Sequence, residues 1–297
     1  MKIFVTGATG FVGSAVVREL LQAGHEVFGL VRSDGAAQSL LAAGAKAYRG
    51  ELEDLDTVRK AAGDSDGVIH TGFNHDFSKF KENCELDRKV IETLGLALGT
   101  AGRPLVITSA IGVLPGGARV TEDTRPLSPS PNPRAASEEA ARALIERGVR
   151  VSIVRLPPSV HGDGDQGFVP ILIKIARDKK TSAFIGTGAN RWPAVHRLDA
   201  ARVFKLAVDE AAHGACYHAV AEEGMAYREI AEVIGRRLNV PVVSKTPEEA
   251  AAHFTWFAHF AALNVVASSE QTQAKLGWRP NQPGLITDLD RPAYFAA

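Results

Sequence analysis

Three glycines near the start of the chain have the types and spacing needed to hold a dinucleotide. The stretch "FVTGATGFVG" places Gly7, Gly10 and Gly13 directly after a strand-like run and at the start of a helical pattern. Gly7 permits a tight turn, Gly10 lets backbone N–H groups approach a pyrophosphate, and Gly13 allows the helix to pack closely on the strand. The N-terminus of the helix that follows favours the negatively charged phosphates. The alternative is a glycine-rich turn that binds no ligand. The other residues expected in this cradle are Thr9, Phe11 and Val12.

The end of the second predicted strand indicates which dinucleotide is bound. In "GLVRSD", Leu30 and Val31 occupy the positions where a carboxylate usually accepts the ribose 2′-OH of NAD, and Arg32 and Ser33 follow. A guanidinium forms charge-assisted hydrogen bonds with a 2′-phosphate. The sequence therefore predicts NADP(H) rather than NAD(H), with a solvated surface role for Arg32 as the alternative.

Further cofactor contacts are expected where the later strands end, because ligands gather at the carboxyl edge of a parallel sheet. The predicted contacts are Glu51 and Leu52 beside the adenine, with Thr71, Gly72, Thr108, Pro157 and Val160 elsewhere along the cofactor. His75 and Asp76, in "TGFNHDF", also follow a strand at this edge.

The elements that must position these residues alternate regularly. Strand-like runs "KIFVT", "EVFGLV", "KAYRG", "GVIH", "PLVITS" and "RVSIVRL" are separated by helical patterns, the first from Phe11 to about Ala23. This rhythm predicts an α/β fold, a Rossmann-type doubly wound parallel sheet with helices on both faces. We expect an NADP-binding domain over residues 1–165, to which the chain returns near 195–220, and a small C-terminal lobe, mainly for substrate, over residues 166–297.

The later segments are less regular. A helix is predicted at Phe168–Arg177, a short strand at "CYHAV", and a loop at the proline-rich Arg125–Arg134. Trp192 and His196 are candidates for lining the pocket. The aromatic stretch Glu248–Leu263 is expected to pack in the core or, as the alternative, to cover an apolar substrate.

Composition limits the class of ligand. The 297 residues include 34 Lys+Arg and 34 Asp+Glu, so no global field favours nucleic acid or an acidic membrane. Cys84 and Cys216 lack CxxC spacing, and the Asp163 loop has Lys174 where an EF-hand needs glutamate, so no metal is expected. No run of about 18 apolar residues suggests a membrane span. These features predict a cytoplasmic protein with a small-molecule substrate.

Several motifs together resemble a known family. The "TGATGFVG" turn, "ITSA" at Ile107–Ala110, "RLPPSVHGDGD" and "KLGWRP" are similar to the extended and atypical short-chain dehydrogenases/reductases, the NAD(P)-dependent epimerase/dehydratase superfamily. The resemblance spans nearly the whole chain. It implies an oxidoreductase in which Ser109 hydrogen-bonds the substrate oxygen, and it implies a monomer or a homodimer paired through the helix in "FSKFKENCELDRKVIETLGLAL".

The chain departs from the family at two catalytic positions. Where members have Tyr-x-x-x-Lys, the alignment places Arg134 and Glu138, which we expect to form a surface ion pair, with a catalytic Arg134 as the alternative. Asp87 stands where an Asn is usual, and His161 stands where a Tyr lies beside the nicotinamide. His161 or water is thus the predicted proton donor. A non-catalytic NADP(H)-binding sensor, or an epimerase or dehydratase, are the alternative functions.

Overall fold

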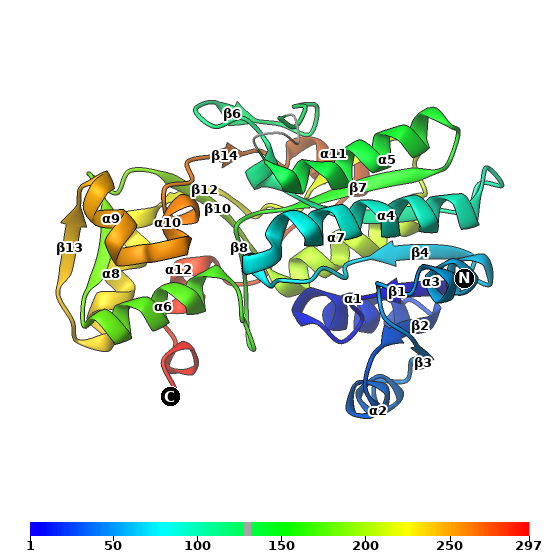
Figure 1. Cartoon of the computed structure of the whole chain (residues 1–297), viewed down its shortest axis with the longest axis horizontal. Helices are drawn as coiled ribbons and strands as arrows, with labels where there is room; N and C mark the ends of the chain where they lie inside the picture. Colours follow the sequence, from blue (N-terminus) through cyan, green and yellow to red (C-terminus); the bar gives the residue numbers. More distant parts are fainter. Residues whose placement is uncertain (128–131, 297) are drawn as a thin grey trace.

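A computed structural model describes residues 1–127 and 132–296 of the chain. Its centre is a seven-stranded parallel sheet of order β11-β7-β5-β4-β1-β2-β3 (Figure 1). The strands are β1 (Lys2–Thr6), β2 (Glu26–Val31), β3 (Lys46–Arg49), β4 (Gly67–His70), β5 (Leu105–Ala110), β7 (Val151–Leu156) and β11 (Cys216–His218). Each of the predicted strand runs is present, and the order reverses between β1 and β4, which confirms the Rossmann-type fold.

Helices cover both faces of this sheet (Figure 1). They are α1 (Phe11–Gln22), α2 (Asp34–Ala42), α3 (Leu55–Gly63), α4 (Phe80–Leu98), α5 (Ala136–Glu146) and α7 (Arg197–Glu210). Neighbouring residues of β1 serve different cores: Ile3 and Val5 pack with α1 and α7, whereas Phe4 packs with α3, α4 and α5. Burial on both faces explains why the strands read as continuous apolar runs.

A second hydrophobic core belongs to the C-terminal lobe, which lies beside the carboxyl ends of the strands (Figure 1). Its helices are α6 (Phe168–Lys179), α8 (Tyr227–Leu238), α9 (Pro247–Phe254), α10 (Ala258–Ala261) and α12 (Leu285–Leu289). The helix α11 (Glu270–Leu276) packs instead against α7 and β11. The short strands of the lobe are β6 (Arg119–Val120), β8 (Ser159–His161), β9 (Ser182–Ile185), β10 (Arg191–His196), β12 (Glu222–Ala226), β13 (Val242–Lys245) and β14 (Val266–Ala267). The helix predicted at Phe168–Arg177 is therefore present and two residues longer.

Trp192 and the proline-rich loop differ in how their predicted positions compare with the structure. Trp192 is 0% exposed and packs among Phe168, Tyr227 and Phe257, so the expectation that it lines a pocket was wrong. Its position in a strand inside the lobe core gives it this burial. The proline-rich loop lies partly outside the described residues, at 128–131, and ends in a 3-10 turn at Pro133–Ala135.

In the described part of the chain, no helix combines the length and the apolar character that crossing a membrane requires.

Candidate active site

The glycine turn after β1 is packed so tightly that only glycine fits. A Cβ on Gly7, whose φ is +66°, would lie 2.7 Å from the backbone nitrogen of Gly72. A Cβ on Gly13 would lie 2.0 Å from the carbonyl oxygen of Gly7 and 2.8 Å from Oγ1 of Thr71. The first turn of α1 has no side-chain cap and no acidic residue, so its N–H groups are open to an anion. The residues present therefore fit a dinucleotide pyrophosphate.

The other residues predicted in the cradle surround this turn. Gly10, which caps α1 in an extended conformation, donates its N–H to the Gly7 carbonyl at 2.9 Å. Thr9 is exposed, and Phe11 and Val12 are half-buried at the start of α1.

The end of β2 presents a guanidinium to solvent. Arg32 is exposed and forms no hydrogen bond or ion pair with the described residues. Ser33 caps α2, accepting the N–H of Ala36 at 3.2 Å, and Asp34 is held by Arg49 at 2.6 Å. The carboxylate of Asp34, two residues after Arg32, is thus paired with Arg49, and Arg32 is left available for a ligand. After β3, Glu51 is exposed while Leu52 packs towards Gly72.

A buried polar chain runs from β1 to the helix that follows β4. Nδ1 of His70 lies 2.7 Å from Oγ1 of Thr6, and its Nε2 lies 2.9 Å from Oδ1 of Asp87. The carboxylate of Asp87 can only accept, so Nε2 of His70 donates to it, while Oγ1 of Thr6 accepts the Gly72 N–H and lies against Nδ1. Thr108 donates its hydroxyl to the carbonyl of His70 at 2.8 Å. The network ties the cofactor cradle to α4.

Asp87 links this chain to the first of the two replaced catalytic positions. Nη1 of Arg134 lies 2.8 Å from its Oδ2, and Ser137 also donates to that oxygen. Burial opposes ionisation of Asp87, but the Arg134 charge and the hydrogen bonds from His70 and Ser137 outweigh it and bring its pKa to about 2. Asp87 is therefore a carboxylate at neutral pH and fixes Arg134.

The second replaced position forms a different ion pair from the one expected. Glu138 is 0% exposed, and its carboxylate binds Arg155 of β7 at 2.7 and 2.8 Å. The predicted surface pair between Arg134 and Glu138 was therefore wrong, because Glu138 faces the sheet, where the buried Arg155 needs a counter-charge. Arg155 in turn donates to Nε2 of His218, 3.1 Å away, and burial together with the Arg155 charge lowers the pKa of that imidazole to about 4.

Ser109 also differs from its predicted role. Its hydroxyl donates to Oε1 of Glu138 at 2.7 Å, and the residue is 1% exposed. Because a hydroxyl has one proton, Ser109 has none left to donate to a substrate oxygen in this structure. Glu138, at the family lysine position, thus takes the hydroxyl proton of Ser109 that the resemblance assigned to the substrate.

Arg134 keeps donors that no described residue uses. Besides Asp87 and Ser137, its guanidinium binds the carbonyl oxygen of Thr108 at 3.1 Å. A guanidinium has five N–H donors, so the single N–H of Nε and one N–H of Nη2 remain unused by the described residues. The side chain is 13% exposed, and its Cζ lies 4.5 Å from the ring centre of Phe73 in the segment after β4. Arg134 is thus a rigidly held cation at the carboxyl edge of the sheet.

His161 is held inside the junction with the lobe. It is 0% exposed, its Nδ1 lies 2.9 Å from Asp288 of α12, and its ring meets that of His196 edge-on at 5.4 Å. Burial lowers its pKa despite the neighbouring carboxylate. These contacts favour a structural role over the predicted proton transfer. Pro157 is buried beside it, and Val160 pairs with Val195 of β10.

His196, the other residue predicted to line the pocket, is 8% exposed. Its Nδ1 caps α7 by accepting the N–H of Leu198 at 3.3 Å. We therefore assign it a structural role too.

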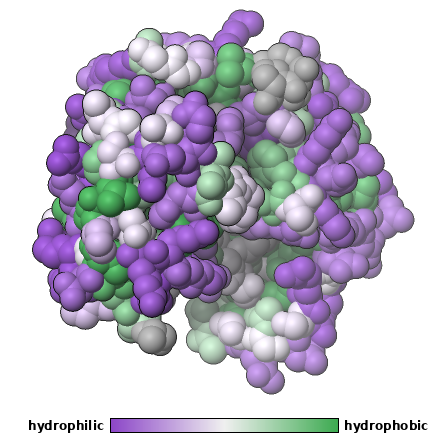
Figure 2. All heavy atoms as spheres, turned by 60° about the vertical axis from the view of Figure 1, so that its left-hand side comes forward, coloured by the Kyte–Doolittle hydropathy of each residue, from purple (hydrophilic) through white to green (hydrophobic). Residues whose placement is uncertain are grey.

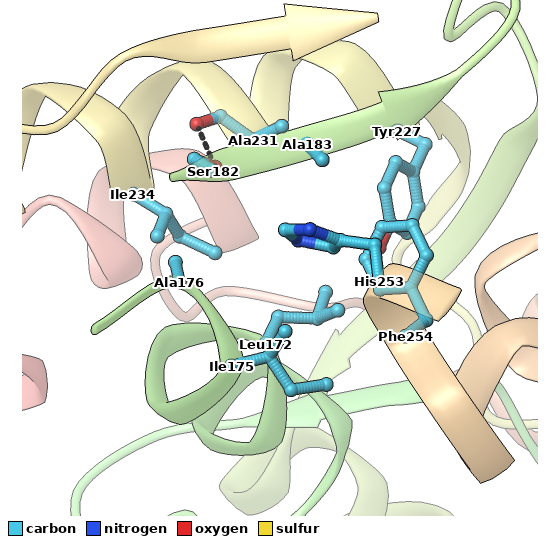
Figure 3. Close-up of a pocket in the computed structure, with 10 residues that line it drawn as sticks. All are labelled: Leu172, Ile175, Ala176, Ser182, Ala183, Tyr227, Ala231, Ile234, His253 and Phe254. Carbon is cyan, nitrogen blue, oxygen red and sulfur yellow. Dashed lines mark hydrogen bonds between the residues drawn. The ribbon is translucent and has the colours of Figure 1, made fainter. Parts of the chain in front are cut away.

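A small internal cavity of the lobe does not belong to this site (Figure 3). It measures about 10 Å³ and is lined by residues of α6, α8, α9 and β9, among them Ser182, whose hydroxyl donates to the Ala231 carbonyl. His253 and Tyr227 in this lining each have a buried polar atom without a partner among the described residues. That volume suits at most one water molecule.

The hydrogen-bonded chain Thr6–His70–Asp87 was not predicted from the sequence. The available signal was a histidine and a threonine that end otherwise apolar buried strands, "KIFVT" and "GVIH", at the edge where ligands bind.

Comparisons with known proteins agree with this geometry. Residues 3–221 match the model of the NAD dependent epimerase/dehydratase family. An uncharacterised protein of Schizosaccharomyces pombe is 50% identical over 295 residues, 99% of this chain and 100% of the relative. A 2-alkyl-3-oxoalkanoate reductase of Stenotrophomonas maltophilia is 28% identical over 82% of this chain and 78% of the relative. A similar fold is found in the crystal structure of DesIV, a dTDP-glucose 4,6-dehydratase of Streptomyces venezuelae with NAD and TYD bound. The TM-score is 0.78 and the sequence identity is 21%, and the match covers 99% of this chain and 97% of that one.

Proposed function

The chain belongs to the NAD dependent epimerase/dehydratase family, as the resemblance predicted, and we propose that it is an NADP(H)-dependent oxidoreductase acting on a small carbonyl or alcohol compound. One observation carries the proposal. The cofactor cradle is intact, and the residue at the family tyrosine position, Arg134, is a fixed cation with spare N–H donors at the same edge of the sheet. The name of the reductase relative supports carbonyl reduction.

Arg134 replaces the tyrosine in position but not in chemistry. An arginine stays protonated at working pH, so it cannot give its proton to a substrate, but it stabilises negative charge that develops on a carbonyl oxygen. Asp87, Ser137 and the Thr108 carbonyl hold the guanidinium in place before a substrate arrives. Such preorganised donors are worth about 10²- to 10³-fold in rate when one is removed.

The proton comes from water or from His75. His75 is exposed, lies 5.2 Å ring to ring from Phe73, and belongs to the segment that Arg134 contacts. Desolvation of the ring by its neighbours and the Arg134 charge lower its pKa, so it would pass a proton on from solvent rather than store one. NADPH would supply the hydride when bound, and Gly7, Gly10, Gly13 and Arg32 are the residues that would hold it.

Arg32 determines the cofactor preference in this proposal. Replacing it with Ala is expected to weaken NADPH binding by about ten- to a hundred-fold, because a charge-assisted contact to the 2′-phosphate is lost. NADH, which lacks that phosphate, is expected to bind the variant as it binds the wild type. Calorimetric titration of both cofactors measures this, with Arg59→Ala on the exposed side of α3 as the control. Equal losses for NADPH and NADH would mean that Arg32 only supports the fold.

The non-catalytic sensor remains the second candidate, favoured by the hydroxyl of Ser109, which is turned into the buried Glu138–Arg155 pair. The two functions are separated by an assay of NADPH oxidation with a panel of aldehydes and ketones. A reductase oxidises NADPH only when a carbonyl compound is present. A sensor binds NADPH and leaves it unchanged with every compound of the panel.

A further inference from the structure

Aromatic side chains connect the segment after β4 to the C-terminal lobe. At their centre is Phe77, whose ring is stacked on that of Trp256 at 5.2 Å and 25°, and lies 5.4 Å from that of Phe260. The ring of Phe168, at the start of α6, lies 6.2 Å from that of Phe77. The aromatic cluster, as we call it, consists of Phe73, His75, Phe77, Phe80, Phe168, Trp256 and Phe260.

Part of the aromatic cluster is in contact with water. Trp256 is 53% exposed, whereas the other two tryptophans, Trp192 and Trp278, are 0% exposed. The phenylalanine rings of the cluster are half-buried. Figure 2 shows a molecular face that is mostly hydrophilic, with hydrophobic atoms confined to separate patches. An exposed tryptophan backed by several half-buried aromatic rings offers the flat apolar surface on which a ligand can bind.

The cluster continues directly to the catalytic cation. The guanidinium of Arg134 lies over Phe73, and His75 lies between Phe73 and Phe77, at 5.2 and 6.2 Å ring to ring. Arg134 is the one cation that lies over a ring of the cluster within the described ranges. One guanidinium beside several flat apolar faces suits a single carbonyl oxygen on an aromatic ring system, and does not suit the two phosphates of a nucleotide sugar.

We propose that the aromatic cluster is the substrate-binding surface of this protein and that its substrate is a planar aromatic carbonyl compound. This inference rests on the proposed reductase function. The aromatic part stacks on Phe77 and Trp256, and the carbonyl oxygen accepts an N–H of Arg134. The carbonyl carbon accepts a hydride from NADPH, the C=O π pair moves to oxygen, and the oxygen takes a proton from water. The carbonyl compound is thereby reduced to an alcohol and NADPH is oxidised to NADP⁺.

The test uses 2-naphthaldehyde as the probe, with cyclohexanecarbaldehyde and UDP-glucose for comparison. Trp256→Ala and Phe77→Ala are each expected to raise the KM for 2-naphthaldehyde by about 2- to 10-fold, the range of one aromatic pair, and to leave the NADPH Kd unchanged. The KM for cyclohexanecarbaldehyde is expected to change less than that for 2-naphthaldehyde. Leu96→Ala, on the exposed face of α4 and outside the cluster, is the control and is expected to change neither constant.

A binding measurement separates this inference from the proposed function, because it needs no turnover. Trp256 is the exposed tryptophan, so 2-naphthaldehyde is expected to quench the tryptophan emission of the wild type and to quench it less in Trp256→Phe, which keeps a ring for stacking. Saturable quenching without NADPH oxidation would refute the reductase function alone. Reduction of cyclohexanecarbaldehyde with no preference for 2-naphthaldehyde, or equal quenching of the wild type and Trp256→Phe, would overturn the aromatic substrate.

Discussion

Glu138→Ala is expected to lower the free energy of unfolding by about 3–5 kcal/mol, because it leaves the guanidinium of Arg155 buried without its counter-charge. Both side chains are 0% exposed and meet through two hydrogen bonds, at 2.7 and 2.8 Å. Denaturant unfolding followed by far-UV circular dichroism measures the change. Glu139→Ala is the matched control. Its carboxylate is exposed and pairs with Arg88, so about 0–1 kcal/mol is expected.

The same pair has a pH signature. Burial opposes the charge of Glu138, but the hydrogen bonds and charge of Arg155 prevail, so its pKa is below the ordinary value of 4.5. A carboxylate whose pKa is lowered on folding contributes stability above its unfolded pKa and loses that contribution as pH falls towards its folded pKa. The stability gap between wild type and Glu138→Gln is therefore expected to narrow as pH falls below about 4.5. A gap that stayed constant down to acid pH would mean that the glutamate charge is not what stabilises the fold.

Arg134→Lys is expected to reduce kcat by about 10²- to 10³-fold with little change in the Kd for NADPH. Lysine keeps one positive charge beside Asp87 but loses the fork that binds Asp87, Ser137 and the Thr108 carbonyl while leaving donors for a substrate. Steady-state kinetics and calorimetry on the same protein measure the two quantities. Thermal unfolding of the variant shows whether its fold is retained.

Two results would contradict this role of Arg134. An unchanged kcat in a folded Arg134→Lys protein would mean that another group stabilises the oxygen. A fall in NADPH affinity that matched the fall in rate would place Arg134 in the cofactor site instead. Arg88→Lys serves as the control, because Arg88 forms comparable ion pairs on the outer side of α4.

The fold and the cofactor cradle could be predicted because their causes are local. The turn at Gly7 and the alternation of strands and helices depend on residues close together in sequence. The strand runs, the α1 helix and the close approach of Gly13 to Gly7 follow from that short-range pattern. The contact of Gly7 with Thr71 and Gly72 depends in addition on the pairing of β1 with β4.

The rebuilt catalytic positions could not be predicted in the same way. Glu138 is four residues from Arg134 and 17 residues from Arg155, and helical spacing alone favours the nearer arginine. Its actual partner, Arg155, is on a strand that is apolar apart from Ser152, and the packing of α5 on β7 brings the two together. Asp87 and Arg134 likewise meet because α4 packs on the start of α5. Side chains that are buried in pairs depend on packing between distant segments.

In the function that we propose, this chain would transfer a hydride from NADPH although the family Tyr and Lys are replaced by Arg134 and Glu138. The most direct measurement supplies NADPH carrying deuterium at the transferable C4 position, with 2-naphthaldehyde and a panel of aliphatic aldehydes and ketones, and analyses the products by mass spectrometry. We expect the wild type to form an alcohol that carries one deuterium, and Arg134→Lys to form almost none. Tight NADPH binding with no labelled alcohol from any compound would contradict the proposed function and would identify the chain as an NADP(H)-binding protein without chemistry.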